Sequence, residues 1–174
     1  YLNDISSLAD TAIDTMRRVI ADLRPSVLDQ LGVLAALEWY VDKIAQRTGL
    51  KCSCLIDPAA AALEVNPERS TALFRTVQEA LTNVVRHAEA TSVAVRVHCD
   101  DDVIVAEVED NGKGMDVVRT LNRQSWGIDG MHERARHFGG DLEITSTFKN
   151  GTRVLLRLPL HTPLGTPLED PLEE

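Results

Sequence analysis

Apolar positions near the start of the chain recur at steps of three and four, which predicts a helix over residues 2–23. The spacing is close to a heptad repeat, so the apolar stripe is narrow and suits a coiled coil or a helical bundle. An ordinary amphipathic helix on the surface of a domain stays open as the alternative. We expect this helix to end at Arg24-Pro25, because the residue before a proline disfavours helical backbone. The stripe consists of Leu2, Ile5, Leu8, Ala12, Met16, Val19 and Leu23.

Three more helices are predicted from the same periodicity, over residues 28–47, 67–87 and 128–137. The first takes its apolar positions from Leu31, Leu34, Ala35, Leu37, Trp39, Val41 and Ile44, and Gly49 is its expected stop. The second begins at Asn66-Pro67, since asparagine is a good N-cap and proline is tolerated in the first turn.

Strands are predicted where apolar and polar residues alternate, over residues 51–56, 92–98, 103–109, 142–146 and 152–158. Cys52 and Cys54 fall on one face of the first strand, where we expect them to pack against the core rather than bind metal. The order of elements predicts an α/β sandwich, with one mixed sheet, helices on one face and a long helix in front. The expected domains are residues 1–25, 26–160 and an acidic flexible tail over 161–174.

Composition narrows the possible functions. The chain has 174 residues and a formal net charge of −9, which disfavours non-specific nucleic-acid binding, because that affinity comes from cations placed on phosphates. There is no apolar run long enough to span a membrane and no signal-peptide pattern, and three cysteines are not a disulfide framework. We therefore expect a cytoplasmic protein.

A first candidate cluster lies on the helix that follows Pro67, where Glu79, Asn83, Arg86 and His87 are spaced by four, three and one residues. Steps of three and four put side chains on one face of a helix. The Asn83 amide oxygen can be a ligand of Mg²⁺, Glu79 can hold a water molecule, and Arg86 can offset phosphate charge. A plain polar helix face is the alternative.

A second cluster is Asp110-Asn111-Gly112-Lys113-Gly114. Asp110 continues the parity of the apolar row Ile104, Ala106 and Val108, so its carboxylate should point inward and needs a donor such as the exocyclic amine of adenine. The alternative is a glycine-rich turn with a solvated aspartate.

Two weaker signals follow. The run from Trp126 to Met131 carries Gly127 and Gly130 and opens a helix, whose first N–H groups can bind an anion. A simple junction between loop and helix is the alternative there. Gly151-Thr152 is the weakest signal, since any hairpin can hold it.

Taken in order, these motifs resemble the catalytic part of sensor histidine kinases of the nitrate/nitrite-sensor-like branch, whose partners are NarL-type regulators. QEALTNVVRHA resembles the N box, EDNGKGM the G1 box, and WGIDGMHERARHFGG the G2 box of that branch. GTRVLLRLPL resembles the closing strand of the ATPase domain, and LRPSVLDQLGVLAAL the linker from the dimerisation helices. The match covers about residues 17–160, and it is the four boxes in the correct order that make it specific.

The resemblance implies a Bergerat-type two-layer α/β sandwich, preceded by a dimerisation-type helix, that binds ATP and Mg²⁺. Asp110 would contact adenine, and Asn83 would ligate Mg²⁺ with support from Glu79. Arg86 and His87 would face the phosphates or the nucleotide. The glycines of the boxes would flank a short ATP lid at about residues 116–125, and Thr152 would close the adenine pocket. The remaining nucleotide-binding residues that the boxes imply are Gly112, Gly114, Met115, Gly127, Ile128, Gly130 and Met131.

The chain departs from the family pattern at three points. Ser125 stands where the G2 box usually begins with glycine, and His132 replaces the usual arginine. The phosphoacceptor box, a histidine followed by an acid on the first dimerisation helix, does not occur. We therefore expect a fragment of a longer kinase that begins in the second dimerisation helix.

The implied function is transfer of the ATP γ-phosphate to a histidine on that upstream helix and then to a response regulator of the NarL/FixJ type. The longer protein would be a homodimer, attached to a membrane only through upstream segments. One alternative is a degenerate ATP-binding module that regulates a partner without catalysis. Another is an anti-sigma-type serine kinase, whose N box is similar, although the linker and the GMHERA helix favour the histidine kinase.

Overall fold

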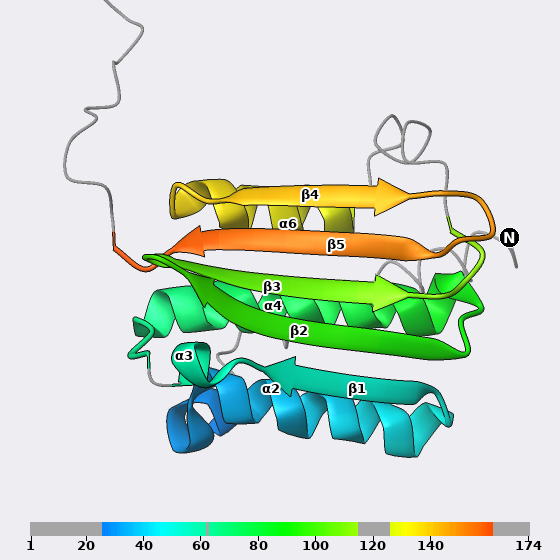
Figure 1. Ribbon diagram of the computed structural model, residues 1–174, viewed down its shortest axis with the longest axis horizontal. Helices are drawn as coiled ribbons and strands as arrows, with labels where there is room; N and C mark the ends of the chain where they lie inside the picture. Colours follow the sequence, from blue (N-terminus) through cyan, green and yellow to red (C-terminus); the bar gives the residue numbers. More distant parts are fainter. Residues whose placement is uncertain (1–25, 62, 115–125, 162–174) are drawn as a thin grey trace, which may run out of the picture.

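A five-stranded mixed sheet carries three long helices on one face (Figure 1). The structure is a computed structural model and describes residues 26–61, 63–114 and 126–161. The predicted helix over residues 2–23, the lid over 116–125 and the tail beyond His161 lie outside the described residues. The architecture confirms the predicted α/β sandwich with a mixed sheet and helices on one face.

The long helices are α2 (Ser26–Thr48), α4 (Pro67–Asn83) and α6 (Trp126–His137). Asn66 caps α4 as expected, since its side-chain oxygen accepts from the Glu68 N–H at 2.8 Å. α6 begins two residues before the predicted start, so Gly127 lies inside its first turn. A four-residue helix, α3 (Pro58–Ala61), was not predicted, because four residues are too few to show a period.

Two of the predicted helices are interrupted. In α2 the backbone at Gly32 is not helical, with φ 75° and ψ 167°, which breaks the first turns from the rest. The helix predicted to run to about His87 is α-helical only to Asn83, and the next five residues form a π-helical segment, η1 (Val84–Ala88). The continuous helices predicted for these two stretches were therefore wrong in detail.

The strands confirm the predicted positions to within a residue or two: β1 (Lys51–Ile56), β2 (Ser92–Asp100), β3 (Val103–Asp110), β4 (Asp141–Ser146) and β5 (Thr152–Pro159). Their order across the sheet is β1-β2-β3-β5-β4. β1 and β2 are parallel, with Cys52 opposite Val93, and the other neighbours are antiparallel.

The core lies between the sheet and the helices. The inward rows of the strands supply Val95, Ile104 and Leu156, all essentially inaccessible, and α4 supplies Leu73 and Leu81. Cys52 and Cys54 pack against this core, as predicted. Leu31 and Trp39, which were counted among the apolar positions of α2, are instead 53% and 45% exposed. Leu31 directly precedes the break at Gly32, and Trp39 falls outside the buried stripe of α2.

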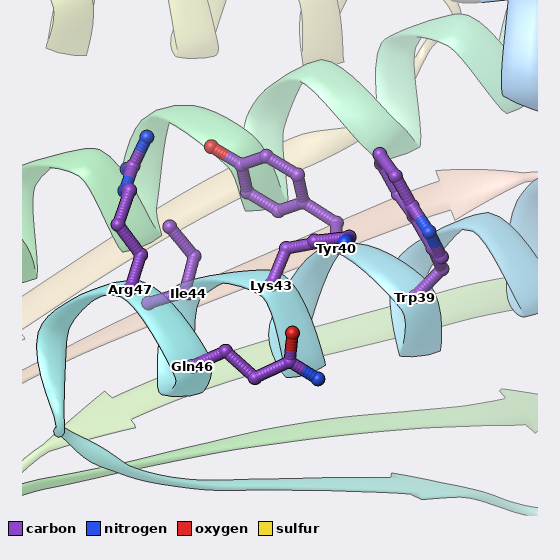
Figure 2. Close-up of a pocket in the computed structure, with 6 residues that line it drawn as sticks. All are labelled: Trp39, Tyr40, Lys43, Ile44, Gln46 and Arg47. Carbon is purple, nitrogen blue, oxygen red and sulfur yellow. The ribbon is translucent and has the colours of Figure 1, made fainter.

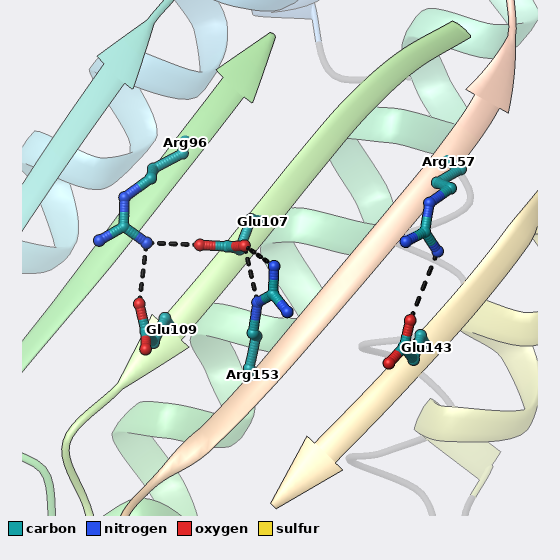
Figure 3. Close-up of polar contacts among 6 residues, drawn as sticks. All are labelled: Arg96, Glu107, Glu109, Glu143, Arg153 and Arg157. Atoms are coloured by element: carbon teal, nitrogen blue, oxygen red, sulfur yellow. Dashed lines mark hydrogen bonds and ion pairs between the residues drawn. The ribbon is translucent and has the colours of Figure 1, made fainter. Parts of the chain in front are cut away.

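The opposite face of the sheet is polar and carries a row of ion pairs across β2, β3, β5 and β4 (Figure 3). Glu107 in the centre accepts from both Arg96 and Arg153, and Arg96 also donates to Glu109 at 2.8 Å. Arg157 lies 3.5 Å from Glu143 on the next strand. Charged pairs on this face stabilise an open sheet that no described element covers. Among the residues described, no helix is long and apolar enough to cross a membrane.

Candidate functional site

A cavity of about 410 Å³ opens at the end of the molecule where α4 and β3 finish. Its lining comes from α4 and η1, from β3 and the turn after it, from α6, and from β4 and β5. Of the residues predicted for the site, the cavity brings together Asn83, Arg86, His87, Asp110, Gly114, Ile128, Met131 and Thr152. Segments from the N, G1 and G2 boxes and from the closing strand therefore meet at one place, as the sequence motifs implied.

Asp110 is the buried acid of the cavity, with only 5% of its surface exposed. It sits at the inward end of the row Ile104, Ala106 and Val108, which confirms the parity argument. Its Oδ1 accepts from the Gly112 N–H at 2.7 Å, and the backbone N–H of Thr152 also donates to this carboxylate. Burial nevertheless raises the pKa of Asp110 above its ordinary value, against the lowering effect of these hydrogen bonds. A buried, acceptor-rich group of this kind can recognise a ligand N–H.

The turn after Asp110 is held tightly at two glycines. A Cβ on Gly112 would lie 2.2 Å from the Ala88 carbonyl oxygen, so only glycine allows the turn to approach the end of η1. Gly114 has φ +69°, and a Cβ there would lie 2.3 Å from the Thr147 carbonyl oxygen. The residue between them, Lys113, donates its N–H to the Ala88 carbonyl at 2.8 Å. The turn is thus fixed between η1 and the β4–β5 hairpin.

The π-helical segment η1 shapes the opposite wall of the cavity. Asn83, the last α-helical residue, lines the cavity together with the exposed Arg86 and His87 from η1. A π turn holds more residues than an α turn, and such segments are frequent at functional sites. The widened turn therefore carries Arg86 and His87 on the cavity wall that Asn83 begins.

Two predicted residues, Glu79 and Gly127, lie against each other instead of lining the cavity. Glu79 is half-buried on α4, and its Oε1 lies 2.2 Å from the position that a Cβ on Gly127 would occupy. The absent side chain at Gly127 therefore makes room for the Glu79 carboxylate beside the first turn of α6, where a negative charge is favourable. Gly112 does not line the cavity either, since it packs against Ala88. A Cβ placed on Gly130 would lie 3.2 Å from its nearest atom, Arg134 Nη1. Met115 and Ser125 lie outside the described residues.

The apolar walls of the cavity were only partly predicted. Val108, Ile144 and Val154 line it together with Ile128 and Met131, and Val154 pairs in register with both Val108 and Ile144. The alternation of the strands could have predicted these positions, because they share the inward face of the sheet with Asp110. The resulting cavity has apolar sides and a few convergent polar groups, which is typical of a small-molecule site.

The mouth of the cavity is cationic although the chain as a whole is acidic. Lys113 also lines it, a residue that the motifs did not single out, and its Nζ lies 2.6 Å from Glu89 Oε1. Lys113 joins Arg86 and His87 there, and such groups favour a polyanionic ligand. No cluster of three acids, histidines or cysteines that could hold a metal ion occurs among the described residues. A single amide ligand such as Asn83 does suit Mg²⁺ that arrives with a nucleotide, because Mg²⁺ usually shares its shell with phosphates and water.

Comparison with known families identifies the domain that contains the cavity. Residues 68–162 match the family described as "Histidine kinase-, DNA gyrase B-, and HSP90-like ATPase". The chain belongs to this ATPase family. The matched segment contains every residue that lines the cavity, and the family implies ATP as the ligand of this ATPase domain.

The curated relatives are sensor histidine kinases. The ATPase domain and its flanks are 40% identical over 150 residues to "Sensor histidine kinase MctS" of Rhizobium johnstonii, covering 85% of this chain and 32% of the relative. They are 32% identical over 156 residues to "Oxygen sensor histidine kinase NreB" of Staphylococcus carnosus, covering 90% of this chain and 44% of the relative. The chain thus spans about a third to less than half of the length of these relatives.

A solved structure supports the fold. The histidine kinase domain of the blue-light activated histidine kinase from Erythrobacter litoralis EL346 superposes with a TM-score of 0.68 at 24% identity, covering 83% of this chain and 74% of that one. The resemblance found in the boxes is confirmed: the ATPase domain is of the histidine kinase type, with the Bergerat-type sandwich that the boxes implied.

Proposed function

We propose that this domain binds ATP in the cavity and transfers its γ-phosphoryl group to a histidine presented by a separate helix. The observation that carries the proposal is the buried carboxylate of Asp110 in an apolar cavity whose mouth is lined by Asn83, Arg86 and His87. An adenine ring fits such apolar walls, and a triphosphate fits the cationic mouth.

Each end of the nucleotide has candidate partners. The exocyclic amine of adenine donates to Asp110, whose remaining lone pairs are in a water-poor environment where a hydrogen bond discriminates strongly. Ile128, Met131 and Val154 contact the ring, and Thr152 holds Asp110 in place through its N–H.

At the phosphate end, Arg86 and His87 offset charge on the triphosphate. Asn83 would supply one oxygen ligand to Mg²⁺, and the bound metal would offset charge on the phosphates. Glu79, next to Gly127, holds a water molecule or the first turn of α6 in place. These residues align the triphosphate for transfer. Phosphoryl transfer depends mainly on such alignment and on charge stabilisation, because the protein itself takes little part in the covalent chemistry.

Beyond this domain, we propose that the acceptor histidine lies on an upstream dimerisation helix of a cytoplasmic homodimer. The phosphoryl group then passes to a response regulator of the NarL/FixJ type. Support comes from the relatives, all of whose names describe histidine kinases, and from the LRPSVLDQLG linker at the start of α2.

The test is transfer in trans. The chain is incubated with γ-labelled Mg-ATP and an extended form that contains the upstream helices but carries Asp110→Asn. We expect the acid-labile label on the extended chain to increase when the present chain is added, because Asp110→Asn weakens ATP binding in the extended chain itself. ATP binding without any label on the extended chain would instead indicate the regulatory module that binds ATP without catalysis.

A further inference from the structure

Helix α2 carries a groove on the side that faces α4, remote from the ATP cavity (Figure 2). The groove has a volume of about 390 Å³. Its lining is Trp39, Tyr40, Lys43, Ile44, Gln46 and Arg47. Aromatic residues make up only 4% of this chain, yet two of them line this groove and Trp39 is 45% exposed. An exposed tryptophan in a groove is a common anchor for a partner.

The groove is cationic as well as aromatic. Lys43 Nζ lies 5.7 Å from the centre of the Trp39 ring, and Arg47 follows one turn further along the helix. The acids of this stretch, Glu38 and Asp42, lie on the side of α2 near β1 instead. Burial is the main reason why the pKa of Cys54 in β1 is raised to about 11, and the negative charges of Glu38 and Asp42 raise it further. Charge is therefore segregated on α2, with bases on the groove side and acids on the sheet side.

The C-terminal residues match this chemistry. Residues 162–173 read T-P-L-G, T-P-L-E and D-P-L-E, three consecutive tetrapeptides with Pro-Leu at their centres. Proline-rich segments favour the extended polyproline II conformation and dock in grooves lined by aromatic side chains. The acids Glu169, Asp170 and Glu173 complement Lys43 and Arg47.

The tail also starts within reach. Arg69, in the first turn of α4, donates from Nε to the Pro159 carbonyl at 2.8 Å, which fixes the end of β5 beside that turn. Phe74, five residues further along α4 and hence about 8 Å away, contacts the Tyr40 ring edge-on at 5.6 Å. A polyproline II segment from Pro159 to the chain end spans about 45 Å, several times this distance.

We propose that the Pro-Leu tail of this chain docks in cis on the α2 groove, with its leucines and prolines against Trp39 and its acids beside Lys43 and Arg47. The tail then forms a strap along this groove of α2. This inference does not depend on ATP binding or on phosphoryl transfer.

The test uses the full chain with a benzophenone amino acid in place of Leu168. After irradiation, mass spectrometry of the monomeric product is expected to place the crosslink within residues 39–47. Lys43→Glu with Arg47→Glu should reduce that yield about fivefold or more, the effect of losing roughly 1 kcal/mol of charge complementarity. Lys51→Glu with Lys149→Glu, an equal charge change at exposed sites elsewhere, should leave the yield unchanged.

Three results would overturn the proposal: crosslinks between two copies, crosslinks outside α2, or a yield that both charge reversals affect equally. A second measurement applies whether or not the reversed variant folds. In a Trp126→Phe chain, acrylamide quenching of Trp39 should increase when the chain is cut after His161. Quenching that is unchanged by the cut contradicts the strap.

Discussion

At the scale of single residues, Asn83 has the most specific role, because it is the last α-helical residue before η1 and its amide lines the cavity. We expect Asn83→Ala to weaken ATP binding about tenfold in the presence of Mg²⁺, the loss of one ligand or charge-assisted contact. With a chelator present, the same substitution should change ATP affinity little. Calorimetry under both conditions distinguishes these results, and an equal loss in both would make Asn83 a structural residue.

Glu107 is the residue on which the ion pairs of the open sheet face converge. Burial acts to raise its pKa, but the hydrogen bonds from Arg153 and Arg96 prevail and hold the pKa of Glu107 below its ordinary value. A carboxyl whose pKa is depressed by folding contributes stability above its unfolded pKa, and that stability is lost as pH falls through the folded pKa. The contribution of Glu107 should therefore be full at pH 7, decline once the pH falls below the ordinary glutamate pKa, and be lost only below the depressed pKa of the folded state.

The expected cost of Glu107→Gln is about 1–2 kcal/mol in the free energy of unfolding at pH 7, since its side chain is only 12% exposed and accepts from two arginines. Glu143→Gln is the matched control, because Glu143 is more exposed and lies 3.5 Å from Arg157, so its cost should stay below about 0.5 kcal/mol. Urea unfolding at pH 7 and at acidic pH measures both. Equal losses of stability in the two variants would contradict the central role of Glu107 in this network of ion pairs.

At the scale of elements, the π-helical segment η1 is what sets the cavity wall. Deleting Val85, an exposed residue of η1, should convert the wide turn to an α turn and rotate Arg86 and His87 away from the cavity. We expect ATP affinity to fall about tenfold or more. Val85→Ala keeps the residue count and should bind ATP normally. A folded deletion variant, judged by circular dichroism, that binds ATP as tightly as the parent would show that the π turn has no part in the site.

The elements also show what a single sequence can and cannot indicate. Asp110 was predicted to point inward because strand alternation carries the parity of Ile104 and Val108 directly to it. Val154 and Ile144 were not among the predicted site residues, and only the sheet order shows that these two residues border the cavity. The π turn was not predictable, since VVRHA continues the helical period without a glycine or proline to mark a change.

Contacts between distant elements were equally hidden. The pairing of Glu79 with Gly127 depends on how α4 packs against α6, and the pattern of either helix contains no sign of it. The fold class was predictable because the three long helices and the five strands each show their period in the local sequence. The site was predictable only through the sequence boxes that resemble those of a known family. The residues that form the wall of the cavity could not be predicted in detail, because they are brought together by tertiary packing.

At the scale of the whole molecule, the chain should bind ATP without stably phosphorylating itself. Only His132 has an acid directly after it, and it lies half-buried in α6, two residues beyond Gly130. A group held on α6, the same helix whose Ile128 and Met131 line the cavity, cannot easily present its nitrogen in line with the γ-phosphate. Incubation with γ-labelled ATP should leave the chain unlabelled, and acid-labile label that disappears in His132→Gln would contradict this. The histidines to be checked by mass spectrometry are His87, His98, His132, His137 and His161.

Because the pKa of Asp110 is raised by burial, its carboxyl gains a proton at a higher pH than an ordinary aspartate. A protonated Asp110 loses part of its capacity to accept from adenine. We expect ATP affinity to fall as the pH is lowered through this raised pKa, above the range in which solvated aspartates titrate. In Asp110→Asn this part of the pH dependence should be absent, and calorimetry over a series of pH values measures the difference.

The central claim is that the cavity around Asp110 is the ATP site, and the most direct measurement is calorimetry of Mg-ATP binding at pH 7. Asp110→Asn should weaken binding by about 5- to 150-fold, the effect of losing roughly 1–3 kcal/mol from a hydrogen bond to a buried charged acceptor. Glu109→Gln, which changes the adjacent acid on the exposed face of the sheet, should leave affinity within about twofold of the parent. Equal ATP affinity in the parent and in Asp110→Asn would contradict the account.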